Sequence, residues 1–424
     1  MTEYAAPRGM RDFYPEDFRS REAIFEAWKG AARQHGFEFY DSCPVETMEL
    51  LERKAGEEIS EQIYTFLDKS NRRLALRPEL TPTLARMIIA HQRELALPLK
   101  WTAIVQCFRY ERMTRGRKRE HFQWNLDIVG EEGVAAEVEV VAAAVNALRR
   151  LGLTGADFQA RIGSRTVLGG LLAASGIDEA HFPACFLALD KRGKIGDADI
   201  AALLSEAGVP QGAIDQIFEI MSITTLDQVA ARVGEEGRGV ADLRQFFELA
   251  VPMGIADCVT FDVSIVRGLG YYTGIVFEAF DTQRKLRAIF GGGRYDNLLS
   301  SLGGDRMPCV GLGFGDVVVA ELLAECGKSP RTAPEVDYAV GYMEPQARDF
   351  ALRLVAGIRR AGGSCDAALA AEKAKAFFRR ASRAGARQAI YVGPQEVETG
   401  RLRVKDMQAG QEKEVDAAEL MVAE

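Results

Sequence analysis

Apolar residues near the start of the chain recur at helical spacing. Ile24 and Trp28 belong to such a pattern within residues 20–35, and Ser20 is a residue type that often caps a helix N-terminus. Gly36 is expected to end this helix. The pattern therefore predicts an amphipathic helix packed against a core.

A strand followed by a helix is predicted in residues 72–89, RRLALRPELTPTLARMII. The alternating part stops at Pro78. Thr81 is a candidate cap for the helix, and Pro82 suits its first turn. Glu79 lies between the two elements, where an acid at a helix start is common.

The segments WTAIVQCFRYER (101–112) and FQWNLDIVG (122–130) predict two strands joined by a polar hairpin loop with Gly116 at its bend. Polar and apolar residues alternate in the second strand, so Gln123, Asn125 and Asp127 share one face. The solvent face of an antiparallel sheet would explain this pattern. The floor of a pocket is the alternative.

The rest of the chain predicts a helical insertion and a second domain. Residues 165–258 form helical patterns with short polar breaks, and strands return with RGLGYYTGIVFEAF (267–280). CVGLGFGDVVVAELLAECG (309–327) predicts a strand that runs into a helix. Residues 327–336 are a linker by composition, and strands and helices alternate after them.

Composition narrows the class of protein. The 424 residues predict two or three domains, and 47% hydrophobic with 27% charged residues is typical of a folded protein. The sequence shows neither an export signal nor a long apolar span, so we expect a cytoplasmic protein without membrane insertion. Seven scattered cysteines and four separated histidines predict neither disulfides nor a protein-bound metal.

Basic residues gather in the loop 109–120. A solvated hairpin tip is the ordinary explanation. Arg109, however, ends an apolar strand, where a constrained guanidinium suits phosphate or carboxylate oxygens. Glycines in IFGGGRYDNL and GLGFG would let a ligand approach the backbone, although neither segment has P-loop spacing.

Several motifs occur in an order that resembles the histidyl-tRNA synthetase family of class II aminoacyl-tRNA synthetases. They are GMRDFYPED, LRPELTPTLAR, FRYERMTRGRKREHFQ, VRGLGYYTGIVFEAF, FGGGRYDNL and VKDM. The resemblance implies an α+β catalytic domain with a mostly antiparallel sheet in residues 1–326, including the helical insertion at about 165–258. It also implies a C-terminal α/β anticodon-binding domain in residues 337–424, after the linker 327–336.

The resemblance also implies roles for individual residues. Arg267 and Arg109 would be catalytic and would contact the α-phosphate of ATP, which binds with Mg²⁺. Glu111 and Arg117 would complete the ATP site. Side chains that bind histidine would be Glu79 and Thr81 at the ammonium group, Gln123 and Asp127 on the floor, and Tyr271 and Tyr272 around the imidazole.

The reaction implied is ATP-dependent activation of L-histidine to histidyl-adenylate and transfer to tRNA(His). A homodimer is implied through the region around Pro44. In the C-terminal domain, a helix at 371–385 would bury a stripe and expose a cationic face. The stripe comprises Ala374, Phe377, Phe378 and Ala381, and the face comprises Lys373, Lys375, Arg379, Arg380 and Arg383. A solvated helix explains that face as well as RNA contact does.

The sequence departs from the family in motif 3, where Asp316, Val317 and Val318 occupy the region of the usual arginine. Arg117 or Arg306 is a candidate substitute. Two alternatives therefore remain beside the ligase: a regulatory paralog such as the regulatory subunit of ATP phosphoribosyltransferase, and a noncatalytic tRNA-binding sensor. Residues 331–424 argue against the paralog, which lacks the anticodon-binding domain.

Overall fold

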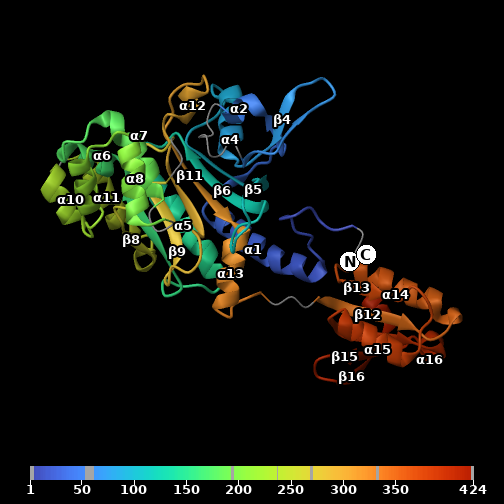
Figure 1. Ribbon diagram of the computed structural model, residues 1–424. Coiled ribbons are helices and arrows are strands. Elements are labelled where there is room, and N and C mark those ends of the chain that lie inside the picture. The colour runs from blue at the N-terminus through green and yellow to red at the C-terminus, as the bar shows by residue number, and fades with distance from the viewer. Residues whose placement is uncertain are drawn as a thin grey trace. The chain divides into compact units, whose positions relative to one another are not determined.

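The computed structural model describes residues 4–52, 62–191, 195–235, 237–267, 271–330 and 334–421. The chain divides into two compact units, one of Met1–Tyr14 with Phe18–Pro330 and the other of Arg331–Glu424 with Pro15–Asp17. Figure 1 shows the elements of each unit.

An eight-stranded sheet forms the centre of the first unit. Its order is β1-β5-β6-β11-β10-β9-β7-β8. The strands are β1 (Glu38–Phe39), β5 (Leu99–Phe108), β6 (Glu120–Val129), β7 (Phe158–Ser164), β8 (Val259–Phe261), β9 (Ile275–Asp281), β10 (Phe290–Arg294) and β11 (Cys309–Gly315). Only the edge pairs β1–β5 and β7–β8 are parallel among these strands. The expected mostly antiparallel α+β fold is confirmed.

The predicted hairpin is formed by β5 and β6, which pair from Leu99 with Val129 to Phe108 with Glu120. Gly116 in the connecting loop has φ +72°, a left-handed conformation that glycine adopts readily. Trp124 is fully buried and stacks on Trp28 with ring centroids 5.9 Å apart. The polar residues of β6 consequently face the other side of the sheet.

Two helix starts differ from the expectation. Helix α1 (Pro15–Gln34) begins at Pro15, and Ser20 lies inside it. Proline has a suitable φ for the first helical position, and the acids that follow favour a helix N-terminus. Helix α4 (Thr81–His91) has Leu80 at its N-cap, so Thr81 is the first helical residue and not the cap.

A group of helices lies between β7 and β8 in the chain and is coloured green to yellow-green in Figure 1. These helices are α6 (Arg165–Ala174), α7 (Phe182–Asp190), α8 (Asp197–Glu206), α9 (Gln211–Ile220), α10 (Leu226–Val233) and α11 (Arg238–Ala250), with the short 3-10 turns η1 (Glu179–His181) and η2 (Ala256–Cys258). Their apolar faces join the same core as Trp124 and Phe158.

The first unit contains several further elements. The small sheet β2-β4-β3 consists of β2 (Val45–Thr47), β3 (Thr65–Leu67) and β4 (Arg73–Leu76). Further helices among the described residues are α2 (Met48–Glu52), α5 (Ala135–Arg150), α12 (Leu298–Ser301) and α13 (Asp316–Glu325). Strand β11 runs directly into α13, as the sequence predicts. The seven cysteines are free thiols.

The second unit has a five-stranded sheet in the order β13-β12-β14-β15-β16. Its strands are β12 (Val336–Tyr342), β13 (Cys365–Ala367), β14 (Ala386–Val392), β15 (Arg401–Asp406) and β16 (Glu412–Asp416); its helices are η3 (Pro345–Ala347), α14 (Arg348–Arg360), α15 (Ala374–Arg383), α16 (Pro394–Thr399) and α17 (Ala417–Met421). Phe377 and Ala381 on α15 are fully buried. Ala374 is exposed, so the expected apolar stripe is shorter than predicted.

Candidate active site

Glycines on β10 and β11 create a flat floor on which polar side chains lie. A methyl group at Gly291 would collide with the guanidinium of Arg267, and one at Gly311 would collide with the carboxylate of Asp127. At Gly313 it would be 2.9 Å from Nε2 of Gln123. The glycines therefore make room for the protein's own functional side chains, where the sequence suggested room for a ligand.

Carboxylates and tyrosines predicted from separate motifs meet above this floor. The hydroxyl of Tyr271 donates to Oε2 of Glu79 at 3.2 Å, and the rings of Tyr271 and Tyr272 have centroids 4.9 Å apart. Tyr295 continues the group: its ring lies 5.9 Å from that of Tyr271, and its hydroxyl donates to Oδ1 of Asp127 at 2.5 Å. We call Glu79, Asp127, Tyr271, Tyr272 and Tyr295 the carboxylate–tyrosine cluster.

Tyr295 was missed in the sequence. It follows the glycines of FGGGRYDNL, and those glycines drew attention to the backbone instead of the side chain after them. Only the aromatic residue beside a glycine run could have indicated it.

Burial changes the acidity of both carboxylates in the cluster. It raises the pKa of Glu79, an effect that the charge of Arg109 and the hydrogen bond from Tyr271 oppose. Burial raises the pKa of Asp127 to about 7, against the hydrogen bond from Tyr295. Oδ2 of Asp127 is buried and has no hydrogen-bond partner within the described residues. A buried acceptor without a donor is rare and indicates a place for a ligand group.

Arg267 reaches the same cluster from the segment before β9. Its backbone is left-handed, with φ +61°, and Nη1 donates to Oε1 of Glu278 at 2.6 Å. Burial disfavours the charged guanidinium and is the largest single influence, but Glu278, Tyr272 and Asp190 together outweigh it and raise the pKa of Arg267. Its Nε is buried and lacks a partner among the residues the structure describes. The side chain thus has a donor left for an anion.

The other predicted residues lie around this centre. Arg109 donates from Nε to the carbonyl oxygen of Pro78 at 2.9 Å, so its charge is held next to Glu79. Gln123 donates from Nε2 to Oδ1 of Asn125 at 3.0 Å on the floor. Thr81 is half-buried at the start of α4, two positions after Glu79.

The arginine-rich loop between β5 and β6 contacts α13. The amide of Gly116 donates to Oε1 of Glu321 at 2.9 Å, and Arg115 pairs with Glu321 at 3.4 Å as well as with Glu325. Arg117 and Glu111, both predicted ATP ligands, form an ion pair with each other. The loop is therefore held by charge pairs within the protein, including one between the two residues predicted to bind ATP.

Asp316, in the segment where the sequence was expected to depart from motif 3, makes contacts that hold the structure together. Oδ2 of Asp316 pairs with Arg11 at 3.0 Å, and Oδ1 accepts from the amide of Phe122 at 2.9 Å. Val318 faces the tip of the loop: a methyl group at Gly116 would be 3.5 Å from its Cγ2. Nη2 of Arg306, one of the expected substitutes, lies 3.6 Å from Oδ2 of Asp296, two residues after the end of β10.

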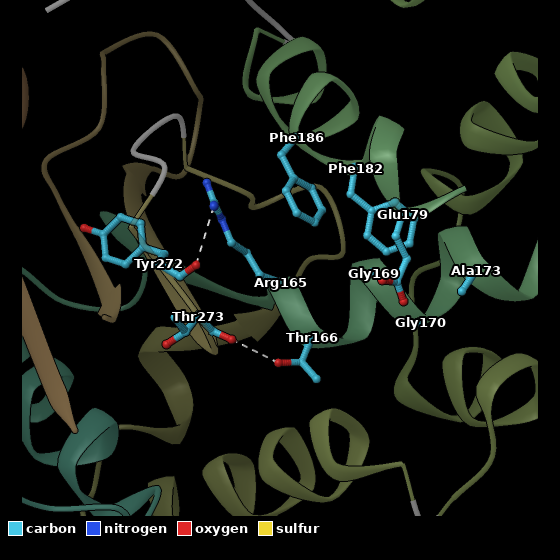
Figure 2. Close-up of a pocket in the computed structure, with 10 residues that line it drawn as sticks. All are labelled: Arg165, Thr166, Gly169, Gly170, Ala173, Glu179, Phe182, Phe186, Tyr272 and Thr273. Atoms are coloured by element: carbon cyan, nitrogen blue, oxygen red, sulfur yellow. Dashed lines mark hydrogen bonds between the residues drawn. The ribbon is translucent and has the colours of Figure 1, made fainter. Parts of the chain in front are cut away.

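A cavity of about 390 Å³ lies beside the cluster and shares Tyr272 with it. Figure 2 shows the residues that line it: Arg165, Thr166, Gly169, Gly170, Ala173, Glu179, Phe182, Phe186, Tyr272 and Thr273. They come from α6, η1, α7 and the segment before β9. The cavity is thus a neighbour of the site and not its centre.

Two kinds of feature are absent from the described part of the chain. Within it, groups of three or more histidine, cysteine or acidic side chains suited to holding a metal ion are absent. Helices long and apolar enough to cross a membrane are absent there as well.

Comparison with known proteins adds the family. A model of the histidyl-tRNA synthetase family matches residues 9–315, and one of an anticodon-binding domain matches residues 337–423. Histidine–tRNA ligase, chloroplastic/mitochondrial, of Arabidopsis thaliana is 44% identical over 98% of this chain and 85% of its own. The histidine–tRNA ligase of Opitutus terrae is 37% identical over 98% and 96%.

Solved structures agree on the fold. The histidyl-tRNA synthetase of a Nostoc species superposes with a TM-score of 0.82 at 23% identity, covering 99% of this chain and 98% of that one. The apo enzyme of S. aureus gives 0.75 at 24% identity, with 98% of each chain covered. With family models matched to both parts of the chain, this protein belongs to the histidyl-tRNA synthetase family.

Proposed function

We propose that this protein is a histidine–tRNA ligase that activates L-histidine with ATP and transfers the histidyl group to tRNA(His). The observation that carries the proposal is that the carboxylate–tyrosine cluster has a buried atom without a partner among the described residues at each of two places. One is Oδ2 of Asp127, whose other oxygen binds Tyr295, and the other is Nε of Arg267, whose charge acts on Tyr272. An acceptor and a cationic donor left open at one site suit a ligand that has both an N–H group and an anionic group. Histidine, with its imidazole and carboxylate, is such a ligand.

The cluster would bind histidine through its polar ends. Glu79 and Thr81 face the ammonium group, while Asp127 and Gln123 meet the imidazole. Tyr271, Tyr272 and Tyr295 enclose the ring. A site built from hydrogen-bonding groups rejects an amino acid without the matching atoms by roughly 10⁴-fold, because rejection leaves its buried polar groups unpaired.

Arg267 and Arg109 would act during adenylate formation. The histidine carboxylate attacks the α-phosphorus of ATP, the bond to the β-phosphate oxygen breaks, and pyrophosphate leaves with its electron pair. Negative charge on the α-phosphate oxygens grows in this step. Guanidinium groups fixed before the reaction stabilise that charge without reorganising.

Magnesium belongs to the proposal as a companion of the nucleotide. Mg²⁺ keeps several waters and takes one or two carboxylates together with phosphate oxygens. Glu278 on β9, which pairs with Arg267, and Glu111 on the loop, which pairs with Arg117, are the carboxylates that would bind this ion. The bound ion would neutralise phosphate charge.

The remaining assignments are also proposals. Residues 1–326 would be the catalytic domain, with the insertion at about 165–258, and residues 337–424 would bind tRNA after the linker 327–336. A homodimer through the Pro44 region and a cytoplasmic location complete the proposal. The regulatory-paralog alternative receives no support from relatives at 37–44% identity, which are ligases.

The direct test is histidine-dependent exchange of pyrophosphate into ATP without tRNA. We expect exchange with histidine and none with leucine, whose side chain has no nitrogen for Asp127. Absence of exchange at saturating histidine would overturn the proposal of a ligase and favour the noncatalytic tRNA-binding sensor.

A further inference from the structure

Arg165 is the first residue of α6, where the chain enters the helical insertion, and its side chain holds the segment that carries Arg267. It donates from Nε to the carbonyl of Val266 at 3.1 Å and from Nη2 to the carbonyl of Arg267 at 2.5 Å. A longer contact of 3.5 Å joins Nη1 to the carbonyl of Tyr272, and Figure 2 shows the guanidinium beside that carbonyl.

The backbone that follows Tyr272 is also anchored to the start of α6. The amide of Arg165 donates to the carbonyl of Gly274 at 3.0 Å, and the hydroxyl of Thr166 donates to the backbone carbonyl of Thr273 at 3.2 Å. The start of one helix thus fixes residues on either side of the Arg267–Tyr271 connection.

Arg267 needs such support because of its backbone. A residue other than glycine is strained in the left-handed region at φ +61°, and this backbone conformation persists only where the surroundings enforce it. One of the backbone carbonyls that Arg165 binds belongs to Arg267 itself. The contact therefore sets the direction in which the Arg267 side chain leaves the backbone and lies over Gly291.

Helix α7 of the insertion faces the same pair of arginines. The ring centroid of Phe186 is 5.1 Å from Cζ of Arg165. The charge of Asp190, at the end of α7, acts on both guanidinium groups. Arg165 is thus held by the insertion on one side while it holds the catalytic segment on the other.

We propose that Arg165 is a positioning residue for adenylate formation: it fixes the left-handed backbone of Arg267 and so directs the Arg267 guanidinium to the reacting phosphate. The inference rests on the role proposed for Arg267. Arg165 itself contacts backbone carbonyls and acts only through the other arginine. It also makes the helical insertion a support of the catalytic step.

The test is a double-mutant cycle measured by histidine-dependent pyrophosphate exchange. We expect Arg165→Ala to lower kcat by about 10- to 100-fold, as a misplacement of roughly 1 Å does, with little change in the KM for histidine. In the Arg267→Ala background the same change should have no further effect, because the residue it positions is gone. Additive losses would overturn the proposal.

Arg149→Ala is the matched control. Arg149 also donates to a backbone carbonyl, that of Gly254 at 2.8 Å, and its other printed partners, Asp257 and Cys258, are not cluster residues, so exchange should stay at the wild-type level. If Arg165→Ala fails a thermal-unfolding check, Arg165→Lys replaces it; lysine keeps the charge but lacks the planar fork. A wild-type kcat in folded Arg165→Lys would overturn the proposal.

The cycle also separates this inference from the proposals beneath it. Near-normal exchange in Arg267→Ala would overturn the role of Arg267 and, with it, that of Arg165. Loss of exchange in the wild-type protein would instead overturn the ligase itself. Loss in Arg267→Ala alone, with normal exchange in Arg165→Ala, would overturn only the positioning role.

Discussion

The candidate active site and helix α15 each contain a central arginine, but the two arginines differ in how their hydrogen-bond donors are satisfied. On α15, Arg380 donates from Nη2 to Glu372 at 2.7 Å and to the carbonyl of Val340 at 3.2 Å, and it also pairs with Asp366. In the active site, Arg267 has one carboxylate, Glu278, and a buried Nε without a partner in the described structure.

The difference distinguishes structural from functional charge. An arginine whose donors are all satisfied by its own domain contributes to stability and has little left for a ligand. An arginine with a buried, unsatisfied donor incurs a desolvation cost that an incoming anion can remove. Mutations in the two places should therefore affect different measurements.

The largest expected effect comes from Arg267→Ala. The variant should lower kcat for pyrophosphate exchange by about 10²- to 10³-fold, the usual result of removing one preorganised donor. Arg284→Ala is the matched control, because Arg284 also has a left-handed backbone, with φ +55°, but is exposed. Similar losses in both variants would show that backbone strain, and not the guanidinium, controls the rate.

Arg380→Ala should affect stability instead of chemistry. The change leaves two half-buried carboxylates without their cation, so we expect the second unit to lose about 1–2 kcal/mol in urea unfolding while exchange stays normal. Arg387→Ala removes pairs that are 68% exposed on the arginine side, and it should cost less than about 0.5 kcal/mol. Equal losses of unfolding free energy in Arg380→Ala and Arg387→Ala would show that the buried pairs of Arg380 stabilise the unit no more than exposed ones.

Asp127→Asn tests the buried acid through pH. The folded-state pKa of Asp127 is raised to about 7, above its ordinary value. The stability that the neutral carboxyl contributes is therefore full below about pH 4 and is lost as pH rises through about 7. Thermal unfolding should show wild-type Tm falling more steeply than that of the variant between those pH values.

Asp305→Asn, at an exposed carboxylate, should leave the pH dependence unchanged. Parallel curves for wild type and Asp127→Asn would mean that Asp127 is ionised in the folded protein at all these pH values.

The smallest effect is expected from the exposed cations of α15. Lys375→Ala with Arg379→Ala should raise the KM for tRNA a few-fold, more at low salt, because phosphate contacts release counterions. Exchange without tRNA should be unaffected. The pair Arg353→Ala with Arg360→Ala, at exposed positions on α14, is the control; an equal rise there would indicate net charge instead of a specific surface.

Strands were the most predictable part of the fold. Alternation of polar and apolar residues located β6 and placed Asp127 on its polar face, whereas β9 was recognised as an apolar run and is buried at most of its positions. Strand β16 was missed because its sequence, EKEVD, is polar and lies at the sheet edge. The N-terminus of α1 was misplaced because Pro15 supplies the start that Ser20 was expected to give.

The site was only partly predictable, since sequence indicates residue types but not which unpaired atoms meet. Motifs indicated Arg267, Glu79 and the tyrosine pair. They could not indicate that Glu278 would pair with Arg267, or that Arg165 would hold its carbonyl, because those contacts depend on how β7 and β9 pair in the sheet.

The glycines beneath the polar side chains affect the thermodynamics of substrate entry. Gly291, Gly311 and Gly313 have no side-chain torsions, so this part of the floor has no rotamers to freeze when a ligand arrives. The backbone entropy of these positions, the largest of any residue type, is already lost when the sheet forms. Folding has therefore completed much of the ordering before the first substrate molecule arrives.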